Sequence, residues 1–102
     1  MLDKQRAEID QIDRELVALF ERRMAIVTEI GEIKKANSLP IFDEAREINV
    51  IERAEERLAN SDYAPYVGQL FKDLMNVTKE YQKNIVKKRE LCTDPQKLDL
   101  KI

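Results

Sequence analysis

The sequence predicts an all-α protein of three helices, the first of them so long that it needs a partner chain. Residues 2–37 contain no Pro and a single Gly, and their apolar residues recur every three or four positions. The whole chain of 102 residues has only 2 Gly and 3 Pro, while 37% of its residues are charged. This spacing and composition are typical of amphipathic helices with charged outer faces.

The first helix is predicted to run from about Leu2 to about Lys35, with Asn37 as its C-terminal cap before Pro40 stops it. At ~1.5 Å per residue it is roughly 50 Å long, whereas a globule of this size is about 25–30 Å across. Its own chain cannot cover it, so we expect the apolar stripe to need a partner. The apolar stripe consists of Ile9, Ile12, Leu16, Leu19, Ile26, Ile30 and Ile33.

Two cations interrupt this stripe. Arg23 fills the gap between Leu19 and Ile26, and Lys34 comes four residues after Ile30. Each has an ordinary explanation: Lys34 could extend its ammonium group to solvent near the helix end, and Arg23 could pair with a Glu across a dimer seam.

The second helix is predicted to begin after Asp43 as N-cap and to end near Asn60. Its inward positions are Ile51, Ala54 and Leu58, and extension of this stripe by one turn places Glu47 on the same side. The carboxylate could instead be favoured by the helix N-terminus.

The third helix is predicted to start with Ser61 or Asp62 as N-cap and to continue to about Arg89. Its stripe of Val67, Phe71, Met75 and Ile85 also contains the polar residues Thr78 and Gln82. A neighbouring stripe is formed by Tyr66, Leu70, Leu74 and Tyr81. Thr78 could bond back to the preceding turn, and Gln82 could lie at a stripe edge.

Composition excludes several functions. The chain has no His, and Cys92 is its only Cys, which disfavours triad hydrolysis, imidazole acid–base catalysis and the usual metal sites. Net charge is −2 without a basic block, so no nucleic-acid partner is expected. The start of the chain does not resemble a secretory signal, and no apolar run is long enough to cross a membrane. We therefore expect a cytoplasmic protein with no metal and no cofactor.

The inward polar residues are more informative together than singly. Burial of unpaired charges costs several kcal/mol each, so two cations, a carboxylate, a hydroxyl and an amide in one apolar core indicate a polar cavity. The cations predict a small anionic ligand with carboxylates. Arg6 lies about 25 Å along the helix from Arg23 and could reach such a cavity only in an antiparallel partner, which predicts two sites per dimer.

These residues also resemble a known family, the all-helical (AroQ) class of chorismate mutases, over about residues 2–85. The resemblance rests on residues 6–13 (RAEIDQID), 19–23 (LFERR), 29–34 (EIGEIK), 39–43 (LPIFD), Arg46 with Glu47, and Thr78 with Gln82.

The resemblance implies an intertwined helical homodimer of three-helix chains. It also implies an isomerase of phenylalanine and tyrosine biosynthesis, in the shikimate pathway, that converts chorismate to prephenate by a Claisen rearrangement. It assigns Arg23 and the partner's Arg6 to the substrate carboxylates, and Lys34 and Gln82 to the ether oxygen. Glu47 and the Asp43 backbone would hold the ring hydroxyl, Arg46 would support the site, and Thr78, where a Ser is usual, would help hold the ring carboxylate.

Two other functions stay open from sequence alone. An isochorismate–pyruvate lyase of the same fold would have a similar cationic pocket, although the set of Lys34, Glu47 and Gln82 favours the mutase. A non-catalytic helical dimer, regulatory or structural, would not need Arg23. We expect residues 1–90 to form the mutase domain and residues 91–102 to be a tail of unassigned role.

Overall fold

The computed structural model describes the backbone of residues 1–91 and the side chains of residues 1–85. It contains α1 (Asp3–Ala36), α2 (Glu44–Glu56), the short 3-10 turn η1 (Ser61–Tyr63) and α3 (Ala64–Leu91). No strand occurs within residues 1–91. The predicted all-α fold with a long first helix is confirmed, and the predicted tail lies almost wholly outside the described residues.

The C-terminal end of α1 is closed by a hydrogen-bonded reversal of the chain. Asn37 is the C-cap, as predicted, but the residue with a positive φ of 53° is Ser38, one position later. The Ser38 amide donates to the Lys35 carbonyl (3.2 Å), and the Leu39 amide donates to the Lys34 carbonyl (2.7 Å). These bonds satisfy carbonyls at the helix end and turn the chain toward α2.

The predicted start of α2 is confirmed, and its predicted end is wrong. The Asp43 carboxylate caps the helix by accepting a hydrogen bond from the Arg46 amide at 3.1 Å. The helix stops at Glu56, with Arg57 as its C-cap, four residues before Asn60. Asn60, rather than Ser61 or Asp62, is the N-cap of η1, and its side chain accepts from the Asp62 amide at 2.9 Å. An Asn side chain readily stabilises such a turn.

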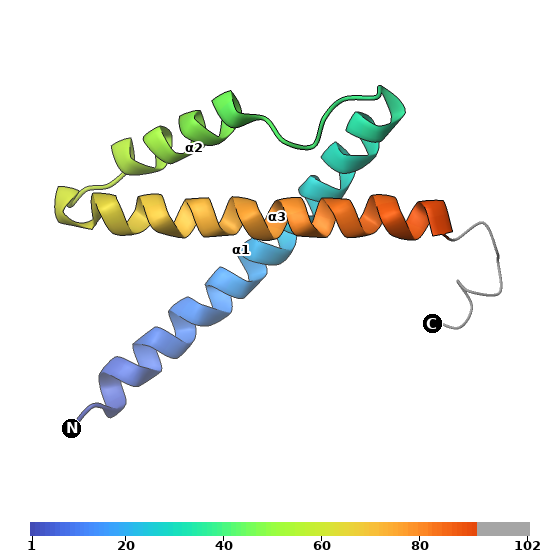
Figure 1. Ribbon diagram of the computed structural model, residues 1–102. Coiled ribbons are helices and arrows are strands. Elements are labelled where there is room, and N and C mark those ends of the chain that lie inside the picture. The colour runs from blue at the N-terminus through green and yellow to red at the C-terminus, as the bar shows by residue number, and fades with distance from the viewer. Residues whose placement is uncertain (92–102) are drawn as a thin grey trace.

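Helix α3 is the element on which the other two assemble. In Figure 1, α2 runs alongside α3, and α1 crosses α3 near its middle. Every residue of the inward stripe predicted for α3 is at least half-buried, and Met75 and Gln82 are buried. On α2, Ala54 is buried and Ile51 is half-buried, as predicted, and Leu58, which follows the end of this helix, is half-buried too.

The apolar stripe of α1 does not face this core. Its seven residues remain 41–59% exposed, and every residue from 1 to 22 is exposed. The buried residues of α1 are instead Val27 and Gly31. They lie in the second half of the helix, which is the part that crosses α3 (Figure 1). Arg23 and Lys34, which the sequence places on this stripe, are half-buried and flank Val27 and Gly31.

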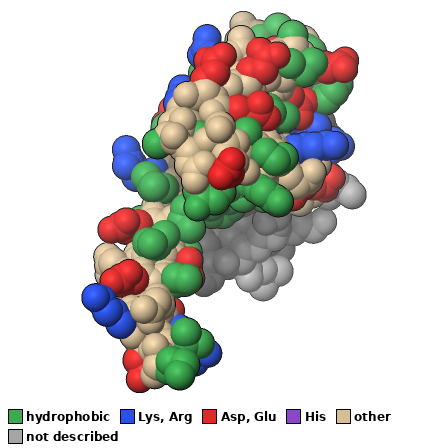
Figure 2. Space-filling model, turned by 90° about the vertical axis from the view of Figure 1, so that its left-hand side faces the viewer, with side chains coloured by type: hydrophobic (Ala, Val, Ile, Leu, Met, Phe, Trp, Pro, Cys, Tyr) green, Lys and Arg blue, Asp and Glu red, His purple; other side chains and the backbone are tan. Residues whose placement is uncertain are grey.

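The first half of α1 extends away from the other helices as an uncovered arm (Figures 1 and 2). The radius of gyration is 17.7 Å, against about 13 Å for a globular chain of this length. Figure 2 shows hydrophobic side chains along this arm. A single chain thus leaves most of the first helix without a packing partner.

None of the helices within the described residues is both long enough and apolar enough to cross a membrane.

Candidate functional site

A cavity of about 270 Å³ lies where α1, α2 and α3 approach one another. All seven site residues that were predicted to act within one chain line it, namely Arg23, Lys34, Asp43, Arg46, Glu47, Thr78 and Gln82. Val27, Ile30, Ile41, Val50, Met75 and Lys79 complete the wall. Arg6 is exposed near the start of α1 and does not line this cavity.

Arg23 is fixed by a neutral partner on another helix. Its Nη1 donates to the Thr78 hydroxyl oxygen at 2.6 Å, and the Thr78 hydroxyl donates in turn to the Leu74 carbonyl at 2.9 Å. The second bond is the local one that the sequence allowed, and it orients the hydroxyl so that its lone pairs face Arg23. Arg23 is therefore held in place without neutralisation by Thr78.

The electrostatic environment of Arg23 favours an anionic ligand. Burial of the guanidinium lowers the pKa of Arg23 from its usual value, and the nearby positive charge of Arg46 lowers it further. Both effects disfavour the charged form. A carboxylate placed between these two cations would offset both effects.

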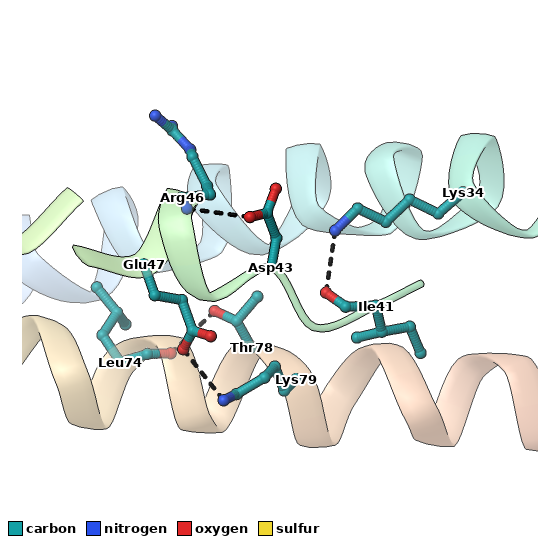
Figure 3. A network of polar contacts seen from close by, with 8 residues as sticks. All are labelled: Lys34, Ile41, Asp43, Arg46, Glu47, Leu74, Thr78 and Lys79. Carbon is teal, nitrogen blue, oxygen red and sulfur yellow. Dashed lines mark hydrogen bonds and ion pairs between the residues drawn. The ribbon is translucent and has the colours of Figure 1, made fainter. Parts of the chain in front are cut away.

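Lys34 points into the chain rather than out to solvent. Its Nζ donates to the Ile41 carbonyl at 3.0 Å (Figure 3), so the simpler interpretation of a solvated lysine at a helix end is wrong. An ammonium group has three N–H donors. The Ile41 carbonyl uses one of them and thereby aims the others.

Gln82 is also an interior residue and not an edge residue. It is only 4% exposed, and its Nε2 donates to the Val27 carbonyl of α1 at 3.2 Å. Gly31 lies beside it, since a Cβ added there would meet Gln82 Cγ at 3.5 Å. The amide is thus held against α1 with donor capacity remaining.

Glu47 faces inward, as predicted, and has a partner that sequence reasoning missed. Lys79 Nζ forms an ion pair with Glu47 Oε1 at 3.0 Å (Figure 3). The other oxygen, Oε2, is buried and accepts no hydrogen bond. The Lys79 ammonium also lies 4.5 Å from the centre of the Phe42 ring.

A sequence signal for Lys79 did exist. Lys79 follows Met75 by four residues and precedes Gln82 by three, so it lies on the same face of α3. The contribution of Ile41 had no such signal, because it is a backbone carbonyl of the loop between α1 and α2.

Asp43 and Arg46 stand at the start of α2, at the same end of the cavity. The Asp43 side chain is occupied by capping the helix, and the Arg46 side chain points away from α3 in Figure 3. The cavity wall contains four cations (Arg23, Lys34, Arg46, Lys79) and two carboxylates (Asp43, Glu47). With Glu47 paired to Lys79, the site is suited to a small ligand with two negative charges.

Among the described residues, no group of three or more His, Cys, Asp or Glu side chains is placed to hold a metal ion. The cations and the Gln82 amide of the cavity wall can orient a bound anion and stabilise negative charge on it.

Comparison with known families identifies this arrangement. Residues 5–83 match the family model described as chorismate mutase type II. The chain belongs to this family. The match contains all three helices' contributions to the cavity, and it ends before residue 90, so the predicted domain boundary at that position stays a prediction.

Relatives of this chain within the family differ in length. The T-protein of Haemophilus influenzae is 34% identical over 70 residues, which cover 69% of this chain and 18% of the relative. The bifunctional chorismate mutase/prephenate dehydratase of Aquifex aeolicus is 40% identical over 52 residues, or 51% of this chain and 14% of the relative. The intracellular chorismate mutase of Mycobacterium tuberculosis is 38% identical over 55 residues, or 54% of this chain and 52% of the relative.

Proposed function

We propose that this protein is a chorismate mutase, an isomerase that converts chorismate to prephenate in phenylalanine and tyrosine biosynthesis. The observation that carries the proposal is the convergence of Arg23, Lys34 and Gln82 from two helices on one cavity. Membership of the chorismate mutase type II family and the mutases among the relatives support it.

Binding of the substrate is proposed to use the fixed cations. Chorismate has two carboxylates, and Arg23, supported by Arg46, would bind one of them in the bidentate geometry that guanidinium groups favour. The Lys34 ammonium group lines the same cavity and has N–H donors that the Ile41 carbonyl does not use. Thr78 would contribute through Arg23, to which it is bonded at 2.6 Å.

Catalysis is proposed to depend on orientation and electrostatics. In a Claisen rearrangement one C–O bond of the ether breaks while one C–C bond forms within the same molecule, so no nucleophile, proton transfer or cofactor is required. The enolpyruvyl arm must be held over the ring, which removes an entropic barrier. Negative charge that develops on the ether oxygen would be stabilised by Lys34 and Gln82, and one such donor is typically worth about 3–4 kcal/mol.

The ring hydroxyl of the substrate would be recognised at the other end of the cavity. Glu47 Oε2 is a buried acceptor without a donor, and such an oxygen is costly unless a ligand satisfies it. The Asp43 backbone lies in the same part of the wall.

The working form is proposed to be an antiparallel homodimer in which the partner's Arg6 completes each site. The exposed stripe of α1 supports this, because a contiguous apolar face of this length is typical of a protein–protein interface. Arg6 is about 25 Å from Arg23 along the helix, so an antiparallel partner brings it to the middle of the neighbouring α1. We place the enzyme in the cytoplasm, since the mycobacterial relative is described as intracellular.

The direct test is incubation of the purified protein with chorismate and, separately, with isochorismate. The proposal predicts loss of chorismate absorbance and a product that is identified as prephenate. Release of pyruvate from isochorismate with no turnover of chorismate would instead establish the lyase. No reaction with either compound would favour a non-catalytic dimer.

A further inference from the structure

Lys79 occupies a position in the cavity wall that no predicted role explains. It is one of four cations there, yet it differs from the other three in its partners. It forms an ion pair with Glu47 and lies over the Phe42 ring. Its side chain and that of Glu47 are 24% and 21% exposed, so the pair is largely removed from solvent.

The two oxygens of Glu47 have different environments. Oε1 is held at 3.0 Å by Lys79, and Oε2 is buried without a donor. A carboxylate on a flexible side chain would normally rotate to satisfy both oxygens. The ion pair to α3 prevents this and leaves one acceptor available at the cavity.

We propose that Lys79 is a positioning residue: it holds Glu47 so that Oε2 stays available to the hydroxyl group of the substrate. Lys79 would thereby select substrates that carry a hydroxyl donor at this end of the cavity. The inference deepens the proposed chorismate mutase activity and rests on it.

The charges around Glu47 make Lys79 the specific partner. Arg46 and Asp43 come from the start of α2, and Arg23 and Lys34 come from α1. Arg23 is bonded to Thr78, and Lys34 to the Ile41 carbonyl. Lys79 is the cation at ion-pair distance from the Glu47 carboxylate, so it is the group that fixes the orientation of this carboxylate.

The Phe42 contact adds a second constraint. Phe42 belongs to the loop that also provides the Ile41 carbonyl for Lys34. A cation above an aromatic ring is attracted to its face, so Lys79 links α3 to this loop as well as to α2. The position of Glu47 and the loop that aims Lys34 are then held by the same ammonium group.

The test is steady-state kinetics with chorismate for Lys79→Met and Lys79→Arg, with Lys72→Met as the matched control. Lys72 is exposed on the same helix. We expect kcat/KM to fall about 10- to 100-fold in Lys79→Met, which is the usual effect of losing a hydrogen bond to a charged group. Lys79→Arg should retain activity within about threefold, and Lys72→Met should match the wild type.

A double-mutant cycle separates positioning from simple packing. In the Glu47→Gln background, Lys79→Met should cause little further loss, because its effect is transmitted through that carboxylate. Lys79→Arg gives an independent readout, because it keeps the positive charge beside Glu47 and should restore activity only while that carboxylate is present.

The outcomes are distinguishable. Inactive wild-type protein would overturn the proposed function and this inference together. Active wild type with an equally active Lys79→Met, or additive losses in the cycle, would overturn the inference alone. If circular dichroism shows that Lys79→Met does not fold, Lys79→Gln is used instead, because glutamine keeps a polar side chain and removes the charge.

Discussion

The two halves of α1 have the same apolar periodicity and opposite environments. From Arg23 to Ala36 the helix packs on α3, buries Val27 and Gly31, and contributes Arg23 and Lys34 to the cavity. From Asp3 to Arg22 no side chain is buried, although Ile9, Ile12, Leu16 and Leu19 continue the stripe.

The difference shows that one sequence pattern serves two purposes. In the second half, residues next to the stripe pack against the rest of the chain, and Arg23 and Lys34 line the polar cavity. In the first half, the stripe has no partner in the chain at all. Since exposed faces of this kind are typical of interfaces, the proposed second copy would cover the first half and would also bring Arg6 to the cavity.

The largest effect is expected from a charge in the uncovered half. Leu16→Lys should dissociate the proposed dimer and abolish activity at low protein concentration, because a lysine would be buried in the interface. Gln11→Lys introduces the same residue on the opposite face of this helix and should have little effect. Sedimentation and chorismate turnover measure both. A Leu16→Lys protein that remained dimeric and active would show that the stripe is not the interface.

In the packed half, removal of either cation should abolish most activity and leave the fold intact. Arg23→Ala and Lys34→Ala should each lower the rate by roughly 100- to 1000-fold, the effect of removing one electrostatic donor. Circular dichroism and sedimentation should be unchanged. Arg22→Ala, an exposed neighbour of Arg23, is the control. Wild-type turnover in either variant would refute the site assignment.

A smaller effect is expected where Arg23 is anchored. Thr78→Val keeps the shape of the side chain and removes the hydroxyl that accepts from Arg23 at 2.6 Å. Activity should fall about 10-fold, the usual effect of one such hydrogen bond, whereas Thr78→Ser should remain near the wild type. Equal activities of the Val and Ser variants would show that the hydroxyl does not position Arg23.

The smallest effect concerns pH. Burial and Arg46 both lower the pKa of Arg23 from its usual value, but a guanidinium group stays protonated at neutral and acidic pH even so. Gln82 is a neutral amide and does not titrate. Activity of the wild type should therefore show no sharp loss between about pH 5 and 7. A steep fall in this range, measured as kcat/KM against pH, would contradict the assigned roles.

The sequence predicted the helices and the cavity better than the packing of α1. Inward positions on α2 and α3 follow a helical period, so Glu47, Thr78 and Gln82 could be assigned before the structure was known. For α1, helix length correctly indicated that the chain leaves the stripe uncovered, but periodicity did not show that Val27 and Gly31, beside the stripe, are the residues buried within the chain. Asn60 was misassigned because an Asn can end one helix or cap the next turn.

Contacts between distant residues could not be predicted. The Lys79–Glu47 pair depends on how α2 lies against α3, and the Lys34–Ile41 bond depends on a turn in which Ser38 adopts a positive φ. The spacing of residues along the sequence predicts neither of these contacts.

The most direct test of the central proposal, a site shared between two chains, is complementation between inactive variants. Arg6→Ala and Lys34→Ala chains would be unfolded together, refolded as a mixture and assayed with chorismate. If the partner's Arg6 completes each site, every mixed dimer contains one intact site. The mixture should then regain about a quarter of wild-type activity, since random association makes about half of the dimers mixed. Activity no greater than the sum of the two separate variants would contradict the shared site.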